Sequence, residues 1–305
     1  MISETYKSQA DLLLQVIPHI AKENTFALMG GTAINLFIRN MPRLSIDIDL
    51  TFLPFDNRET ALTKISNSLG RIRESIQKAL PDTTVNRHIV EGNYAKLLVQ
   101  SKKAQIKIEV NTITRGHLCP AKVLQLNEAV QEEFKMFAAI QVVSNAELYG
   151  GKICAALDRQ HPRDLFDVYL LYKESGITEE IKNGFIAALV SHMRTIHEVL
   201  KPNYLNQRNA FENQFSGMSA IAFTYEDFET TREQLVKDVN SCLSEKDRSF
   251  LMSFKRGNPD WELFPIRNLK EMPAVQWKLK NMRTLIKSNP QKHQELIKKL
   301  ELLFH

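Results

Sequence analysis

The stretch 26–53, with the sequence FALMGGTAINLFIRNMPRLSIDIDLTFL, constrains the fold of this chain more than any other. It opens with four apolar residues and a glycine pair, and the residues from Thr32 to Asn40 have the composition of a helix. A second run, 45–52, alternates polar and apolar residues with the period of two that is typical of a half-buried strand. The stretch therefore predicts a strand, a tight turn at the glycines, a helix and a second strand.

The glycine pair and the aspartates of this stretch have chemistry of their own. Gly30 and Gly31 lack a Cβ, so an anion could approach the first amides of the following helix closely. The strand period puts Asp47 and Asp49 on one face, where two carboxylates repel each other unless a cation lies between them. Mg²⁺ prefers carboxylate oxygens, completed by water and substrate phosphates. An exposed strand face also carries such aspartate pairs, so the pair alone would not decide between a metal site and a solvated surface.

The order of strand, Gly-Gly-Thr, helix, arginine, serine and D-x-D resembles the first motif of the nucleotidyltransferase superfamily. Within it, the chain resembles the AbiEii/AbiGii-type toxins (MenT-like) of bacterial toxin–antitoxin and phage-defence systems. The resemblance implies an α+β fold, with a nucleotidyltransferase core in which helices flank a mixed β-sheet, followed by a mainly helical domain. It also implies an NTP substrate and Mg²⁺ or Mn²⁺, with the metal on the two aspartates. The residues that match the motif are Gly30, Gly31, Thr32, Arg43, Ser45, Asp47 and Asp49.

A third carboxylate of the metal site is expected from the strand 105–112. Its apolar residues, Ile106 and Ile108, alternate with polar ones, which places Glu109 on the polar face. In nucleotidyltransferases a third acid on a neighbouring strand can bind metal or accept the proton of the attacking hydroxyl. Glu109 is therefore the candidate, and an ordinary exposed strand glutamate is the alternative.

A second group of charged residues lies on two predicted helices, one ending near 158 and the next beginning at Pro162. The pattern K-(x6)-R-(x3)-R-D-(x2)-D resembles the downstream motifs of the same toxin family. The resemblance implies that Lys152 binds a nucleotide phosphate. Together with Arg159 and Arg163, this lysine offers positive charge that could bracket a triphosphate. Asp164 and Asp167 would then orient the basic groups or act near the acceptor. The alternative is a buried Arg–Asp network that fixes a helix pair and needs no substrate.

The glycines just before this lysine also need an explanation. Gly150 and Gly151 would lie inside a helix, where each costs about 1 kcal/mol against alanine. Close approach of the helix to a ligand or to the first sheet would explain both.

The length of 305 residues and the 43% hydrophobic content allow two domains with cores of their own. We expect a nucleotidyltransferase core over 1–120 and a mainly helical domain over 121–305 that completes the nucleotide site. The core should contain helices over 4–22 and 59–80, and strands over 83–90, 94–100 and 105–112 with turns at 91–93 and 101–103. The second domain should contain helices over 179–192, 195–200, 225–243, 245–254 and 274–303, the last broken at Pro290, and an irregular segment over 202–217.

Other features exclude several classes of protein. No apolar run is long enough to span a membrane, and the start of the chain does not have the pattern of a signal peptide, so we expect a cytoplasmic protein. The three cysteines are widely spaced, which argues against a disulfide framework or a zinc site. The phenylalanines between 211 and 228 are expected in the core rather than on bases. The C-terminal part is basic, which is consistent with RNA contact or with a solvated helix face; its cations are Lys278, Lys280, Arg283, Lys287, Lys292, Lys298 and Lys299.

By resemblance, then, the chain is a toxin that transfers a nucleoside monophosphate from an NTP to the 3′ end of tRNA and is neutralised by a cognate antitoxin encoded nearby. Two other functions remain open at this point. The acceptor could be a protein or a small molecule, or the chain could be a catalytically silent binding or regulatory module. The complete D-x-D motif and Lys152 argue against the silent module.

Overall fold

The computed structural model describes residues 4–90 and 93–304, so the expected turn at 91–93 lies largely outside the described residues. The residues it describes form two compact units, which we treat separately. The first comprises Met1–Ser144 and Ser216–Ala222, and the second comprises Asn145–Phe215 and Phe223–His305.

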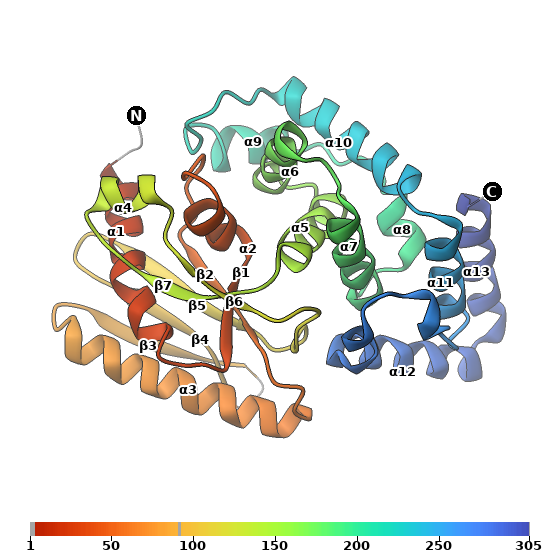
Figure 1. The fold of residues 1–305 in the computed structure, drawn as a ribbon, viewed down its shortest axis with the longest axis horizontal. Coiled ribbons are helices and arrows are strands. Elements are labelled where there is room, and N and C mark those ends of the chain that lie inside the picture. Colours follow the sequence, from red (N-terminus) through yellow and green to blue (C-terminus); the bar gives the residue numbers. More distant parts are fainter. Residues whose placement is uncertain (1–3, 91–92, 305) are drawn as a thin grey trace. The chain divides into compact units, whose positions relative to one another are not determined.

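In the described part of the first unit, a seven-stranded sheet has the order β3-β4-β5-β2-β1-β7-β6 (Figure 1). The sheet is mixed, as expected, because β1 pairs parallel with β7 and β2 parallel with β5, while the other pairs are antiparallel. The strands expected after the long helix are confirmed. The strand bounds are β1 Phe26–Met29, β2 Asp47–Phe52, β3 Thr84–Val90, β4 Asn93–Gln100, β5 Gln105–Asn111, β6 Lys122–Gln125 and β7 Ala139–Val142.

The first unit extends to Ser144 rather than to 120, because β6 and β7 belong to its sheet. Neither of these four-residue strands was predicted. The short helix α4 Glu128–Phe134 connects them.

Two helices of the first unit cover its sheet. Helix α1 Glu4–Ile20 contacts β5, β7 and α3, and helix α3 Arg58–Ala79 contacts β3 and β4 (Figure 1). The apolar face of α1 is fully buried, including Leu13 and Val16. Asn57 caps the start of α3 by accepting a hydrogen bond from the Thr60 N–H. Both helices confirm the sequence prediction.

The glycine segment differs from the expected tight turn. Helix α2 Gly30–Thr32 follows β1 directly and continues into η1 Ala33–Ile38, a π-helix. Gly30 has a φ of 73°, a left-handed conformation in which glycine carries no Cβ penalty. The chain therefore passes from strand to helix at Gly30 without a separate turn, and the helix ends at Ile38 instead of Asn40.

A distant segment completes the first unit. The Leu44 N–H donates to the Met218 carbonyl at 3.0 Å, and the Ala220 N–H donates to the Pro42 carbonyl at 2.9 Å. Residues 216–222 thus hold the loop that leads into β2, although they come from the later part of the chain.

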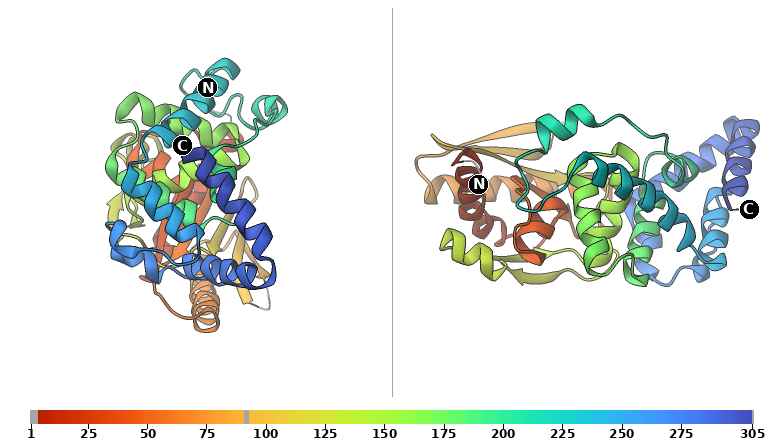
Figure 2. Two further views of the ribbon diagram at one scale, coloured as in Figure 1. Left: turned by 90° about the vertical axis from the view of Figure 1, so that its right-hand side faces the viewer. Right: turned by 90° about the horizontal axis from the view of Figure 1, so that it is seen from above.

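The second unit is mainly helical, as expected. Helices α12 and α13 contact each other near the C-terminus (Figure 2). The predicted break at Pro290 is confirmed, because α12 ends at Ser288 and α13 begins at Pro290. Helix α9 lies inside the segment that was expected to be irregular. The helices are α5 Asn145–Arg159, α6 Pro162–Glu174, α7 Glu179–Ser191, α8 Ile196–Leu200, α9 Arg208–Gln214, α10 Tyr225–Ser241, α11 Glu245–Lys255, α12 Pro273–Ser288 and α13 Pro290–Phe304, with 3₁₀ turns η2 Trp261–Leu263 and η3 Arg267–Glu271.

Aromatic packing forms part of the core of the second unit. Phe166 lies 5.4 Å from Phe223 and 5.3 Å from Phe215 between ring centroids, and Phe211 lies 6.2 Å from Phe228. All of these rings are buried, so the prediction that the phenylalanines between 211 and 228 belong to the core is confirmed. No helix in the described ranges is both long and apolar enough to cross a membrane.

The glycine pair of α5 has a different explanation from the one expected. A Cβ on Gly150 would overlap the backbone of Gly184 in α7, and a Cβ on Gly184 would overlap the Ala146 carbonyl in α5. The two helices therefore pack backbone to backbone at Gly150 and Gly184. Gly151 faces no atom within 4 Å, so its presence is not explained by packing.

Candidate functional site

The parallel pairing of β2 with β5 gathers the acidic residues of the first unit. Asp49 lies opposite Glu109, and Asp47 lies opposite Lys107. The alternate residues of both strands, such as Ile48 and Ile108, are fully buried, so the charged side chains share the other face. The register thus places Glu109 beside the D-x-D pair, where the sequence analysis expected a third acid.

Lys107 supplies a positive charge among these carboxylates. Its Nζ lies 2.9 Å from Glu109 Oε2 and 3.9 Å from Asp47 Oδ1. Partial burial disfavours the charged form of the lysine, but the hydrogen bond to Glu109 and the charges of the acids outweigh burial and raise the pKa of Lys107. The lysine is therefore an ammonium at neutral pH. The alternation that exposes Glu109 places Lys107 on the same face.

The glycines of α2 make room for the other residues of the motif. A Cβ on Gly31 would lie 2.8 Å from Arg43 Nη2 and 2.9 Å from Ser45 Oγ. A Cβ on Gly30 would lie 2.8 Å from Asp49 Oδ2. A side chain at either position would have to displace side chains of the motif, which approach the backbone there. The residues that matched the family pattern are thus close together in space as well as in sequence.

Two residues of this motif are buried and bonded to protein. Thr32 is completely buried, and its hydroxyl donates to the main-chain carbonyl of Asp47 and lies 3.0 Å from Ser45 Oγ. Arg43 is 3% exposed and donates from Nη1 to the Leu44 carbonyl at 2.9 Å. These contacts fix the start of β2 against α2. The expected phosphate contacts of Thr32 and Arg43 stay predictions.

The residues of this site could hold a divalent metal only if the nucleotide supplies further ligands. Among the described residues, no three or more Asp, Glu, His or Cys side chains are arranged to hold a metal by themselves. Mg²⁺, however, usually takes one or two protein carboxylates and completes its coordination with water and substrate phosphates. The aspartates of β2 have the right donor atoms for this arrangement, and the Asp47 side chain is 39% exposed. The residues therefore fit a metal that binds together with the triphosphate.

The second unit contains a buried charge network between α5 and α6. Lys152 Nζ lies 2.7 Å from Asp164 Oδ1 and 3.1 Å from Asp167 Oδ2. Arg159 Nε lies 2.6 Å from Asp164 Oδ2. Lys152 is 8% exposed, and the two aspartates are 1% and 0% exposed.

The positive charges of this network keep Asp164 ionised. Burial alone would raise the pKa of Asp164, but the charge of Lys152 and the hydrogen bonds and charge of Arg159 outweigh it and hold this pKa well below its usual range. Arg163 is half-buried and takes no part in these ion pairs. The helix pair is therefore fixed by a buried network, as the alternative interpretation held, and the phosphate contact of Lys152 stays a prediction.

Comparison with known proteins decides the family. The model of the nucleotidyl transferase AbiEii toxin family, of type IV toxin–antitoxin systems, matches residues 11–281. The chain belongs to the AbiEii toxin family. This match spans both the D-x-D strand and the Lys152 network, and it confirms the resemblance found in the sequence.

The solved structure of MenT4 shows the same fold as this AbiEii protein. MenT4, a nucleotidyltransferase toxin from Mycobacterium tuberculosis H37Rv, is 14% identical and superposes with a TM-score of 0.60, over 92% of this chain and 95% of MenT4. A putative nucleotidyltransferase from H. pylori is 16% identical with a TM-score of 0.47, over 79% of this chain and 98% of the other. No curated protein matches the sequence.

Proposed function

We propose that this AbiEii-family protein transfers a nucleoside monophosphate from an NTP to the 3′ end of tRNA, with Mg²⁺ or Mn²⁺ on Asp47 and Asp49. The observation that carries the proposal is the arrangement of β2, β5 and α2. The carboxylates and the glycine-lined backbone of the family motif lie together there, with part of the acidic face exposed to solvent. Membership of the toxin family supports an NTP substrate and a cognate antitoxin as partner.

Each side chain then has a role in the transfer. The metal, when bound, neutralises charge on the triphosphate and on the leaving pyrophosphate. Glu109 is 46% exposed and lies opposite Asp49, a position from which it can accept the proton of the attacking hydroxyl or bind metal. Lys107 limits the repulsion between the acids before the substrate enters. Gly30 and Gly31 let phosphate oxygens approach the amides of α2.

We further propose that Lys152 of the second unit binds a nucleotide phosphate, as in the family pattern. The buried aspartates Asp164 and Asp167 hold its ammonium in one position. Arg163 would add positive charge beside this group. Action in the cytoplasm follows from the tRNA acceptor.

The experiment uses the purified protein, each of the four α-labelled NTPs and total tRNA, with a parallel reaction on total protein. We expect label in tRNA with Mg²⁺, and none with a chelator. Periodate oxidation removes the 3′ diol of tRNA. If the 3′ end is the acceptor, the oxidised tRNA should take no label. Label in the protein fraction alone would support a protein acceptor, and no label in any fraction would support a catalytically silent module.

A further inference from the structure

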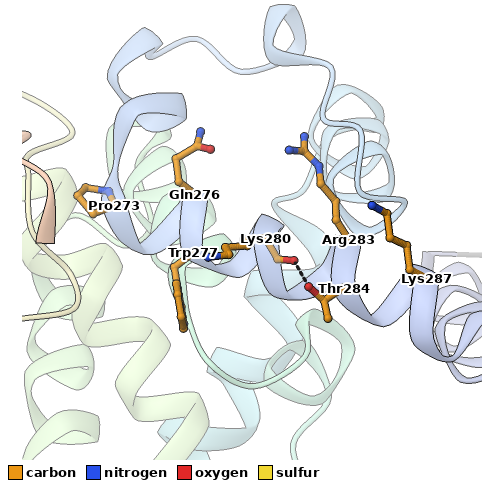
Figure 3. A pocket seen from close by; sticks show the side chains of 7 residues that line it. All are labelled: Pro273, Gln276, Trp277, Lys280, Arg283, Thr284 and Lys287. Atoms are coloured by element: carbon orange, nitrogen blue, oxygen red, sulfur yellow. Dashed lines mark hydrogen bonds between the residues drawn. The ribbon is translucent and has the colours of Figure 1, made fainter.

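One face of helix α12 is hollowed and basic (Figure 3). Each of these residues has another member of the group three or four positions away along α12, so they form one stripe on the helix surface. Together they line a hollow of about 540 Å³ in the second unit. The lining residues are Pro273, Gln276, Trp277, Lys280, Arg283, Thr284 and Lys287.

The charge of this helix has one sign. The sequence of α12 contains lysines and an arginine but no aspartate or glutamate. Lys280, Arg283 and Lys287 are exposed on the hollowed face. Such a one-sided cluster of cations attracts a polyanion, because each phosphate that it neutralises releases counterions.

Lys278 does not belong to this face, although the sequence analysis grouped it with the others. Its ammonium donates to the Leu189 and Arg194 carbonyls, both at 3.1 Å. Burial lowers the pKa of Lys278 to about 8. Lys278 therefore anchors α12 to the rest of the second unit, and the expectation that it contacts RNA is corrected.

An exposed aromatic ring lies among the cations. Trp277 is 57% exposed, and Lys280 Nζ lies 5.5 Å from the centroid of its ring. Arg283 donates from Nε to the Gly257 carbonyl at 3.3 Å, which orients its guanidinium and uses one of five donors. An aromatic ring flanked by cations is the combination by which proteins hold single-stranded nucleic acid, with bases stacked on rings and phosphates on cations.

We propose that the α12 face, defined by Trp277, Lys280, Arg283 and Lys287, binds a single-stranded segment of the RNA acceptor. The inference rests on the proposed RNA acceptor and names where that RNA is held. Duplex RNA would satisfy the cations but would offer the indole ring no unstacked base. From Trp277 to Lys287 the helix rises about 15 Å, a length that suits a few unpaired nucleotides.

The test compares two sets of variants in the full-length protein. The first neutralises the α12 face by Lys280→Ala, Arg283→Ala and Lys287→Ala together. The matched control removes three exposed cations from the neighbouring helix α13 by Lys292→Ala, Lys298→Ala and Lys299→Ala. Both sets lower the net charge equally, and alanine favours the helix in each. Binding of a fluorescent twelve-nucleotide oligouridine is measured at several salt concentrations.

We expect the α12 set to reduce the slope of log affinity against log salt by about 2, since each single-strand phosphate contact contributes about 0.7. The α13 set should leave the slope unchanged. Trp277→Ala should weaken binding about fivefold or more, as expected for the loss of one stacked base. Trp277→Phe should retain most of the affinity, because it keeps an aromatic ring.

Several results would overturn the inference. They are an unchanged slope in the α12 set, an equal effect of the α13 set, and equal binding of duplex RNA of the same length. Polyglutamate that binds the α12 face as tightly as oligouridine would also overturn it and point to an acidic protein partner. If the wild type binds oligouridine through the α12 face but labels no RNA, the transfer proposal fails, and the α12 face stands as a site for single-stranded RNA that is not an acceptor. If tRNA is labelled while the α12 set binds RNA normally, the transfer proposal stands and the inference about the α12 face fails.

Discussion

Lys107 allows acidic side chains to share one side of the β2–β5 pair. Sequence periodicity predicted which face of its strand Glu109 occupies, since alternation is a local property. The contact of Lys107 with Asp47 depends on the parallel register between two strands about sixty residues apart in the sequence, which no local pattern specifies. The same holds for Thr32, whose hydroxyl donates to the Asp47 carbonyl of β2.

Replacement of Lys107 tests its role as the cation of the metal-free site. We expect Lys107→Ala to raise the affinity for Mn²⁺ without nucleotide about three- to fivefold, because the metal no longer competes with an ammonium. This change in affinity corresponds to about 1 kcal/mol, the upper end of the range for a solvent-exposed ion pair. Titration of Mn²⁺ followed by EPR measures it, with the exposed Lys103→Ala as control. Equal affinities for all three proteins would contradict this role.

Replacement of Lys152 separates phosphate binding from a purely structural role. Lys152→Ala should weaken NTP binding and slow transfer. Lys152→Arg should restore only part of both, because a planar guanidinium does not replace a point charge. The alanine variant should also lose about 3 kcal/mol of stability, since Asp164 and Asp167 lose a buried partner. Calorimetric titration of NTP into folded protein is decisive: lowered stability with unchanged affinity would restrict Lys152 to fixing the helices.

Helices were predicted better than short strands. Helix α3 has a cap and a long apolar period, so its bounds could be predicted closely. Strands β6 and β7 are four residues long, and the sheet that stabilises them is formed by other parts of the chain. The π-helix η1 gave no local signal, and the packing of α5 on α7 could not be predicted from Gly150 without knowing that Gly184 faces it.

The two glycines of α5 form a matched pair for mutagenesis. Gly150→Ala should destabilise the protein, because the added Cβ overlaps the backbone of α7. Gly151→Ala should leave stability unchanged or raise it by up to about 1 kcal/mol, since the position is open and alanine favours a helix. Urea unfolding of both variants measures the difference. A destabilised Gly151→Ala beside a neutral Gly150→Ala would contradict the packing.

The network between α5 and α6 should make stability depend on pH in acid. The pKa of Asp164 is lower in the folded protein than its ordinary value of 3.8, so its ion pairs stabilise the protein above that value. This stability is lost as the pH falls below 3.8 toward the folded pKa. Asp164→Asn should therefore cost about 3 kcal/mol at pH 7 and flatten the acid limb of the stability curve. If Asp164→Asn loses stability with falling pH as the wild type does, other groups cause the acid dependence of stability.

The sequence predicted two units, a core with a sheet followed by a mainly helical unit, because most of the second half of the sequence has helical periods. The boundary between the two units was not predicted correctly, since it depends on the parallel pairing of β7 with β1. Nor could the sequence show that residues 216–222 return to the first unit and bond to Pro42 and Leu44. Long-range contacts of this kind are set by the whole fold.

The central claim is that the D-x-D aspartates hold the metal for nucleotide transfer, and transfer by Asp49→Ala tests it most directly. The measurement is incorporation of α-labelled NMP into tRNA by the wild type, by Asp47→Ala and Asp49→Ala, and by the exposed Asp82→Ala as control. We expect no transfer by the first two variants and full transfer by the control. Stability should hardly change, because removing one carboxylate also relieves repulsion. Retained transfer by a folded Asp49→Ala protein would contradict the account.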